Sequence, residues 1–187
     1  MTVGMRLFAA LEVPAAVRER LDAAVAPLRE RHPGLAWSSR DGWHLTVAFL
    51  GEVVAPPEDV AAVLAPVAAG APAMIRLVLV TPGRFGRRVL WVGVRDEPAG
   101  AVAALGAAAQ QALAEADLPV DFKEVRPHLT IARARRRASD VSATLVAAIP
   151  TVEGAWTACE LLLMRSVPGG HRRPSRHEPL ARLPLGG

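Results

Sequence analysis

The stretch HLTVAFL at residues 44–50 has a near copy, HLTIAR, at residues 128–133, and this repeat decides the fold. Both copies are rich in β-compatible residues, so each is predicted to form a strand. Side chains alternate between the two faces of a strand, so the histidine and the threonine of each copy point the same way. The apolar residues are predicted to point the other way and to anchor each strand on a core, namely Leu45, Val47, Phe49, Leu129 and Ile131.

Further elements surround the two copies and follow from apolar periodicity with glycine and proline as boundaries. Strands are expected over residues 6–11, 36–38, 74–80, 89–94 and 161–164. Helices are expected over residues 14–31, 57–69 and 98–117, because Pro14, Pro57 and Pro98 can open a helix. A fourth helix is expected to begin at Ser139 as its N-cap and to end near residue 149.

The two halves of the chain, roughly 5–82 and 83–185, share the order strand, helix, histidine-bearing strand, helix, strand. Equivalent landmarks keep a similar offset: His128 follows His44 by 128 − 44 = 84 residues, and Arg165 follows Val80 by 165 − 80 = 85. A duplicated chain predicts one domain over residues 1–187 with two similar lobes and a central groove between them. This arrangement would bring His44 and His128 face to face.

Two facing histidines can act as an acid and a base, because the imidazole pKa lies near neutrality. Each threonine hydroxyl can donate to a phosphate oxygen, so Thr46 and Thr130 would complete a cradle for one tetrahedral anion. Chance would give roughly 0.2 His-x-Thr matches along this chain, so two matches at equivalent places favour catalysis over a structural role. Cyclic phosphate hydrolysis fits this cradle and needs no cofactor.

A metal site is the rival interpretation of the two histidines. Neither motif carries a nearby third ligand, although an aspartate or glutamate from elsewhere in the chain could complete the coordination. The sequence therefore predicts no metal at this site.

Composition and net charge indicate which partners and which location to expect for the protein. The net charge is +4, and Lys123 is the only lysine, so the positive charge is almost entirely arginine. Arginine binds phosphate through two parallel hydrogen bonds, so the excess of arginine suits an RNA partner. A bias in the nucleotide composition of the genome would give the same excess of arginine over lysine. The apolar runs are too short for a membrane span or a secretory signal, and Cys159 is a single cysteine. We expect a cytoplasmic, monomeric protein without an obligate protein partner.

Five segments carry a resemblance to a known family: MRLFAALEVP, WHLTVAFLGE, LWVGV, RPHLTIAR and RSVPGGHRRPSRHEPLARLPL. In this order they resemble the landmarks of the two-histidine phosphoesterases. The nearest branch is the bacterial and archaeal RNA 2′,3′-cyclic phosphodiesterases, also called 2′-5′ RNA ligases. The resemblance runs from about Met5 to Leu185 and covers nearly the whole chain.

The resemblance implies an α+β fold with two antiparallel sheets that flank the groove and helices on the outside. It implies that His44 is the proton donor, that His128 is the proton acceptor, and that Thr46 and Thr130 bind phosphate. The implied reaction opens RNA 2′,3′-cyclic phosphate ends to 2′-phosphomonoesters without a metal, and the reverse reaction would form 2′-5′ linkages.

Some residues depart from the family pattern or lie beside it. The family often has a tyrosine in the closing segment, whereas this chain has no tyrosine and has His177 near that place. Arg133 could bind phosphate, but strand alternation puts it on the face opposite His128 unless the strand ends or bulges. The loop from Gly169 to Arg176 holds Arg172, Arg173 and Arg176, which either follow an RNA backbone or are simply solvated. Three aromatics beside strands could stack on a base but are more often core: Trp37, Trp43 and Phe85.

Two alternatives stay open at this point. The same four groups could act on a small cyclic nucleotide-like phosphate, and salt dependence would separate this substrate from RNA. The chain could also be a non-catalytic RNA-binding module, which turnover by the purified protein would exclude.

Overall fold

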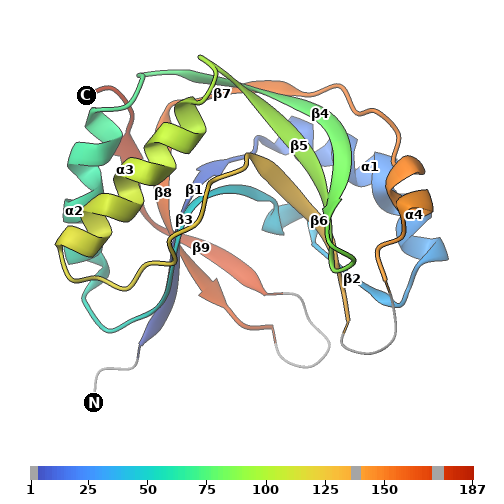
Figure 1. Cartoon of the computed structure of the whole chain (residues 1–187), viewed down its shortest axis with the longest axis horizontal. Coiled ribbons are helices and arrows are strands. Elements are labelled where there is room, and N and C mark those ends of the chain that lie inside the picture. Colours follow the sequence, from blue (N-terminus) through green and yellow to red (C-terminus); the bar gives the residue numbers. More distant parts are fainter. Residues whose placement is uncertain (1–3, 136–139, 170–174) are drawn as a thin grey trace.

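The computed structural model describes residues 4–135, 140–169 and 175–187 (Figure 1). Its strands are β1 (Met5–Glu12), β2 (Leu35–Trp37), β3 (His44–Val53), β4 (Ile75–Phe85), β5 (Val89–Glu97), β6 (His128–Ala134), β7 (Ala155–Ala158), β8 (Glu160–Val167) and β9 (Arg176–Pro184). Its helices are α1 (Ala15–Arg31), the short 3-10 helix η1 (Arg40–Gly42), α2 (Pro57–Ala69), α3 (Ala101–Glu115) and α4 (Ala143–Ala147).

The strands form two antiparallel sheets, which we call sheet A and sheet B. Sheet A has the order β3-β1-β8-β9, and sheet B has the order β2-β6-β5-β4-β7. Helices α2 and α3 lie on the outer side of sheet A, and α1 and α4 lie on the outer side of sheet B (Figure 1). The predicted α+β fold, with two antiparallel sheets and external helices, is confirmed.

Each sheet takes strands from both halves of the chain, so a lobe of the structure is not a half of the sequence. Strands β8 and β9 come from the second half and join β1 and β3 in sheet A, whereas β4 comes from the first half and joins sheet B. The β1 residue Leu7 pairs with Arg165 of β8, at the far end of the sequence. Whether the chain arose by duplication stays a prediction.

The core lies between each sheet and its helices. In β1 the alternate residues Leu7, Ala9 and Leu11 are buried in the main apolar cluster, and Val60 and Leu64 of α2 belong to the same cluster. The opposite face of sheet A carries a second, smaller apolar cluster on the groove side, formed by Phe8, Ala10, Leu162 and Met164. A buried leucine side chain contributes about 1.5–3 kcal/mol, so the main cluster fixes the sheets that carry the site.

Strands β3 and β4 extend past their predicted ends at residues 50 and 80, and two predicted helix starts are wrong. The fourth helix begins at Ala143 and not at Ser139, which lies outside the described residues, because Ser142 is the N-cap and its hydroxyl accepts from the Leu145 amide. The third helix begins at Ala101, three residues after Pro98, because the buried carboxylate of Asp96 accepts from the Val102 amide and fixes the first turn there.

Strand β9 was not predicted at all. It contains Pro179 and Pro184 and lies at the edge of sheet A, where a missing amide donor is tolerated. Its residues are mostly exposed, so it lacks the apolar alternation that marks the other strands.

Within the described ranges, no helix combines the length and the apolar character needed to cross a bilayer.

Candidate active site

The two histidine-bearing strands contain matching irregularities that shape the site. In β6, Thr130 and Ala132 pair with the consecutive residues Trp91 and Leu90 of β5, so Ile131 is an extra residue that forms a bulge. In β3, Thr46 and Ala48 pair with consecutive residues of β1, which makes Val47 the equivalent bulge. Strands β3 and β6 contact each other where the two sheets meet, so both motifs open onto one space.

Each bulge reverses the alternation beyond it, which corrects the prediction for Phe49 and meets the condition set for Arg133. Phe49 was predicted to point into the core, but it packs with the groove-side cluster and lines the groove. Arg133 occupies the equivalent place in β6 and also lines the groove, on the same face as His128. Ser38 of the adjacent chain segment supports the bulge, because its hydroxyl donates to the Thr130 carbonyl at 2.8 Å and its amide donates to the Ile131 carbonyl at 2.9 Å.

The two motif histidines are held in the same way. The Nδ1 of His44 lies 2.8 Å from the Gly42 carbonyl oxygen, and the Nδ1 of His128 lies 2.6 Å from the Arg126 carbonyl oxygen. A carbonyl can only accept, so Nδ1 carries the proton in both rings. Each ring therefore leaves Nε2 as the nitrogen available for chemistry, as a proton acceptor in the neutral form.

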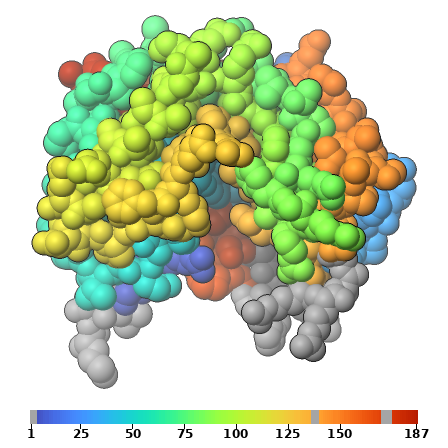
Figure 2. Space-filling view, viewed as in Figure 1, coloured from blue at the N-terminus to red at the C-terminus, as the bar shows by residue number. Residues whose placement is uncertain are grey.

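The space between the sheets is a groove of about 720 Å³, which is within the usual range for a small-ligand site. The space-filling view shows the surface hollowed between the two lobes (Figure 2). All five predicted site residues line this groove, namely His44, Thr46, His128, Thr130 and Arg133. Its other charged residues among the described positions are Arg6 and Lys123, and no described aspartate or glutamate lines it, so the groove attracts anions.

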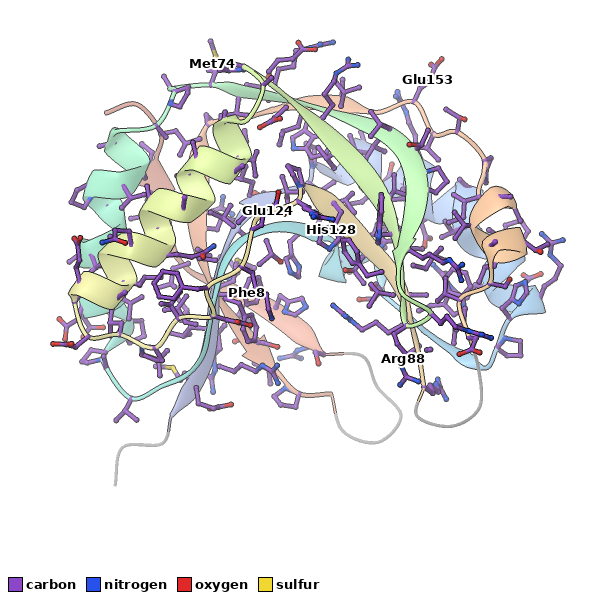
Figure 3. All side chains as sticks on the ribbon, viewed as in Figure 1. Phe8, Met74, Arg88, Glu124, His128 and Glu153 are labelled. Atoms are coloured by element: carbon purple, nitrogen blue, oxygen red, sulfur yellow. The ribbon has the colours of Figure 1, made fainter. Side chains whose placement is uncertain are left out.

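Aromatic rings surround both histidines. The Phe8 and His44 ring centroids are 4.6 Å apart, and the Phe85 and His128 centroids are 4.9 Å apart. Figure 3 shows Phe8 on sheet A and His128 on sheet B, both at the inner side of the groove. Trp91 completes the group around His128, with its centroid 6.3 Å from the imidazole. These apolar neighbours displace water from the two imidazoles.

Burial dominates the electrostatics of the two histidines. Burial and, next to it, the charge of the neighbouring His177 together lower the pKa of His44 to about 4, against the opposing effect of the hydrogen bond to Gly42. Burial also lowers the pKa of His128, and Arg133 adds to this effect. Both rings are therefore neutral at pH 7 in the free protein. An anionic ligand in the groove would favour the protonated form.

Arg133 itself lies at the boundary between protein and solvent. Its surroundings lower the pKa of the guanidinium from its usual value through desolvation, although the side chain still reaches solvent. Arginine nevertheless stays charged at neutral pH, because its ordinary pKa lies far above 7. Arg133 therefore places a fixed positive charge within electrostatic reach of His44 and His128.

Comparison with known proteins identifies the family of this chain. Residues 14–170 match the 2′-5′ RNA ligase superfamily. The chain belongs to the 2′-5′ RNA ligase superfamily. Within this superfamily it is 31% identical to the RNA 2′,3′-cyclic phosphodiesterase of Escherichia coli K12, and the match covers 99% of both chains. It is also 28% identical to the RNA 2′,3′-cyclic phosphodiesterase of Geobacillus stearothermophilus. That match covers 82% of this chain but only about half (48%) of the relative.

Solved structures of other proteins have the same fold as this chain. The structure of E. coli LigT complexed with 3′-AMP has a TM-score of 0.71 at 25% identity, over 98% of this chain and 99% of that chain. The structure of TT0787 of Thermus thermophilus has a TM-score of 0.74 at 25% identity, over 98% and 99%. The family resemblance of the sequence is thereby confirmed.

Several groove residues were not predicted as site residues, among them Phe8, Trp43, Phe85 and His177. The sequence favours a core position for Trp43 and Phe85, as for Trp37. Phe8 and Phe85 pack directly on the motif histidines, and no local pattern distinguishes them from core residues. His177 did have a signal, because it stands where the family often has tyrosine. Its strand was not predicted, so its place beside His44 could not be inferred.

Proposed function

We propose that this chain is an RNA 2′,3′-cyclic phosphodiesterase that opens the cyclic phosphate at an RNA end to a 2′-phosphomonoester. The observation that carries the proposal is the pair of His-x-Thr strands that open onto one groove, each with its histidine Nε2 available. The names of the two curated relatives support the substrate class. The 3′-AMP in the E. coli LigT structure supports a groove that accepts a phosphorylated nucleoside.

In the proposed reaction, water attacks phosphorus while its proton passes to Nε2 of His128. The bond between phosphorus and the ribose 3′ oxygen breaks, and that oxygen leaves with the proton donated by Nε2 of His44. The products are a 2′-phosphate and a free 3′-hydroxyl, so atoms and charges balance. Thr46, Thr130 and Arg133 hold the nonbridging oxygens, where negative charge develops.

His44 must gain a proton before it can donate one, because burial keeps it neutral in the free protein. The anionic phosphodiester supplies the reason for this gain, since an opposite charge within about 4–6 Å favours the protonated imidazole. The hydrogen bond from Nδ1 to the Gly42 carbonyl persists in the protonated form and stabilises it. Substrate binding and acid protonation are therefore coupled in this proposal.

The test is turnover of an oligoribonucleotide with a 2′,3′-cyclic phosphate end, measured in chelator for the wild type and for His44→Ala and His128→Ala. We expect turnover by the wild type, release of a 2′-phosphate, and a loss of at least about 10²-fold in each variant. His32→Ala is the matched control, because His32 is exposed and does not line the groove. Turnover that survives either motif substitution, or that needs a metal, would contradict the mechanism.

A smaller substrate is the second candidate, and the groove volume favours it. About 720 Å³ holds a single nucleotide rather than a long RNA segment. If RNA beyond the terminal nucleotide contributes, kcat/KM for the oligonucleotide should fall steeply with salt, whereas kcat/KM for a nucleoside 2′,3′-cyclic phosphate should change little. Equal salt dependence of kcat/KM for the two substrates would favour the small substrate. Ligation that forms 2′-5′ linkages would be detected as the reverse reaction at high RNA concentration.

A further inference from the structure

A third histidine, His177 of β9, lies in the groove beside His44. The ring centroids of His44 and His177 are 4.8 Å apart, and each ring also contacts Phe8, at 4.6 Å and 5.1 Å. The corresponding group around His128 consists of Phe85 and Trp91. The two sides of the groove thus match in shape, but among the described residues only the His44 side has an imidazole as the additional ring.

The two nitrogens of His177 have different surroundings. Its Nδ1 is buried and has no hydrogen-bond partner among the described residues, although the side chain as a whole is half-buried and lines the groove. A neutral imidazole has one N–H group and one lone pair. Burying an N–H group without an acceptor loses a hydrogen bond to water, so the proton is more stable on Nε2. Because Nδ1 is buried while the side chain lines the groove, the opposite edge of the ring, which bears Nε2 and the donor, is the edge directed at the groove.

A purely structural role does not account for this residue. Phenylalanine would fill the same space between Phe8 and His44, and it would avoid the cost of a buried nitrogen without a partner. Burial lowers the pKa of His177, so the ring stays neutral at pH 7 and keeps a lone pair on Nδ1. What histidine offers over phenylalanine at this position is a neutral N–H donor that faces the groove.

We propose that His177 is a substrate-binding residue whose Nε2–H donates a hydrogen bond to an oxygen of the cyclic phosphodiester beside His44. This assignment rests on the proposed function. No covalent step is involved, and His177 neither takes nor gives a proton in the reaction. Because His177 lies on the His44 side only, it makes the groove asymmetric and favours one orientation of the cyclic phosphate over its mirror arrangement.

The test compares three substitutions at one position. His177→Gln places an amide N–H near the position of Nε2, His177→Asn places one near Nδ1, and His177→Phe keeps only the ring. We expect His177→Phe and His177→Asn to lower kcat/KM for the cyclic phosphate substrate by about 10- to 100-fold, the effect of one hydrogen bond to an anion. His177→Gln should stay within a few-fold of the wild type. Thermal unfolding of each variant checks that the fold is kept.

The opposite ranking, with full activity in His177→Phe and a loss in His177→Gln, would show a packing role and overturn the proposal. Equal activity in all variants, or an equal loss in all of them, would also overturn it.

Binding separates this proposal from the proposed function. Calorimetric titration with adenosine 2′-phosphate should show the same ranking of affinities even if the wild type turns over no cyclic phosphate. Absence of turnover would refute the phosphodiesterase function, whereas equal affinities in His177→Phe and His177→Gln would refute the role of His177. Imidazole ¹⁵N chemical shifts give a third readout: His177 should carry its proton on Nε2, and His44 and His128 should carry theirs on Nδ1.

Discussion

The burial of His44 predicts a specific dependence of stability on pH. The pKa of this group falls from an ordinary value of 6.5 to about 4 on folding, mainly because burial removes water from the ring. The unfolded chain therefore binds a proton between these two pH values and the folded chain does not. The free energy of unfolding must fall as the pH decreases through this window, and it is unaffected by His44 above it.

The size of the effect follows from the shift. Each pKa unit corresponds to about 1.4 kcal/mol, so acidification from about pH 7 to about pH 5 should cost about 2 kcal/mol through His44 alone. His44→Asn is the informative variant, because the asparagine amide can donate to the Gly42 carbonyl in place of Nδ1 but does not titrate. The variant should be less stable than the wild type at pH 7, and this deficit should shrink on acidification.

Urea denaturation at both pH values, followed by circular dichroism, measures the difference. The other histidines and the carboxylates titrate in both proteins, so their contributions cancel in the comparison of wild type with variant. A change in unfolding free energy with pH that is the same in His44→Asn and in the wild type would refute the reasoning. It would mean that the imidazole is hydrated as well in the folded protein as in the unfolded chain.

Three further results are expected. The pH profile of kcat/KM should be bell-shaped with its maximum below about pH 6.5, because burial lowers the pKa of both His44 and His128, and an optimum near pH 8 would contradict this. Gly83→Ala should destabilise the fold by about 1–3 kcal/mol in urea denaturation and lower kcat/KM, because a Cβ there would overlap the Trp91 ring and displace it from His128; unchanged stability would contradict this. Arg133→Lys should raise KM for the cyclic phosphate more than it lowers kcat, because lysine keeps the charge but loses the bidentate fork; an unchanged KM would show that Arg133 does not bind the substrate.

Much of the site could be predicted from the sequence because its pattern is local. The alternation within each His-x-Thr strand places His44 and Thr46 on one face, and the repeat pairs them with His128 and Thr130. Both inferences depend only on the period of a strand, and the structure brings all four residues to one groove. Their catalytic and binding roles stay predictions until the variants are measured.

The residues that the sequence misplaced depend on pairing with distant strands. The bulge at Ile131 exists because two residues of β5 pair with three of β6, and nothing within HLTIAR indicates it. Phe49 and Arg133 lie just beyond the two bulges. Strict alternation assigns Phe49 to the wrong face, and it allows Arg133 in the site only if the strand ends or bulges, as it does. His177 lies on an edge strand with two prolines, where neither propensity nor periodicity predicts a strand.

The exchange of strands between the lobes has a consequence for how this chain can fold and be divided. Sheet A cannot close until β8 is synthesised, because β1 lies between β3 and β8. The fold thus has a high contact order, which is typical of slow folding. A chain cut near residue 150 would retain both His-x-Thr motifs and yet lose half the strands of sheet A. Conversely, the chain passes several times between sheet A and sheet B, and these connections tie the two lobes together. The walls of the groove therefore cannot separate like two domains on a hinge.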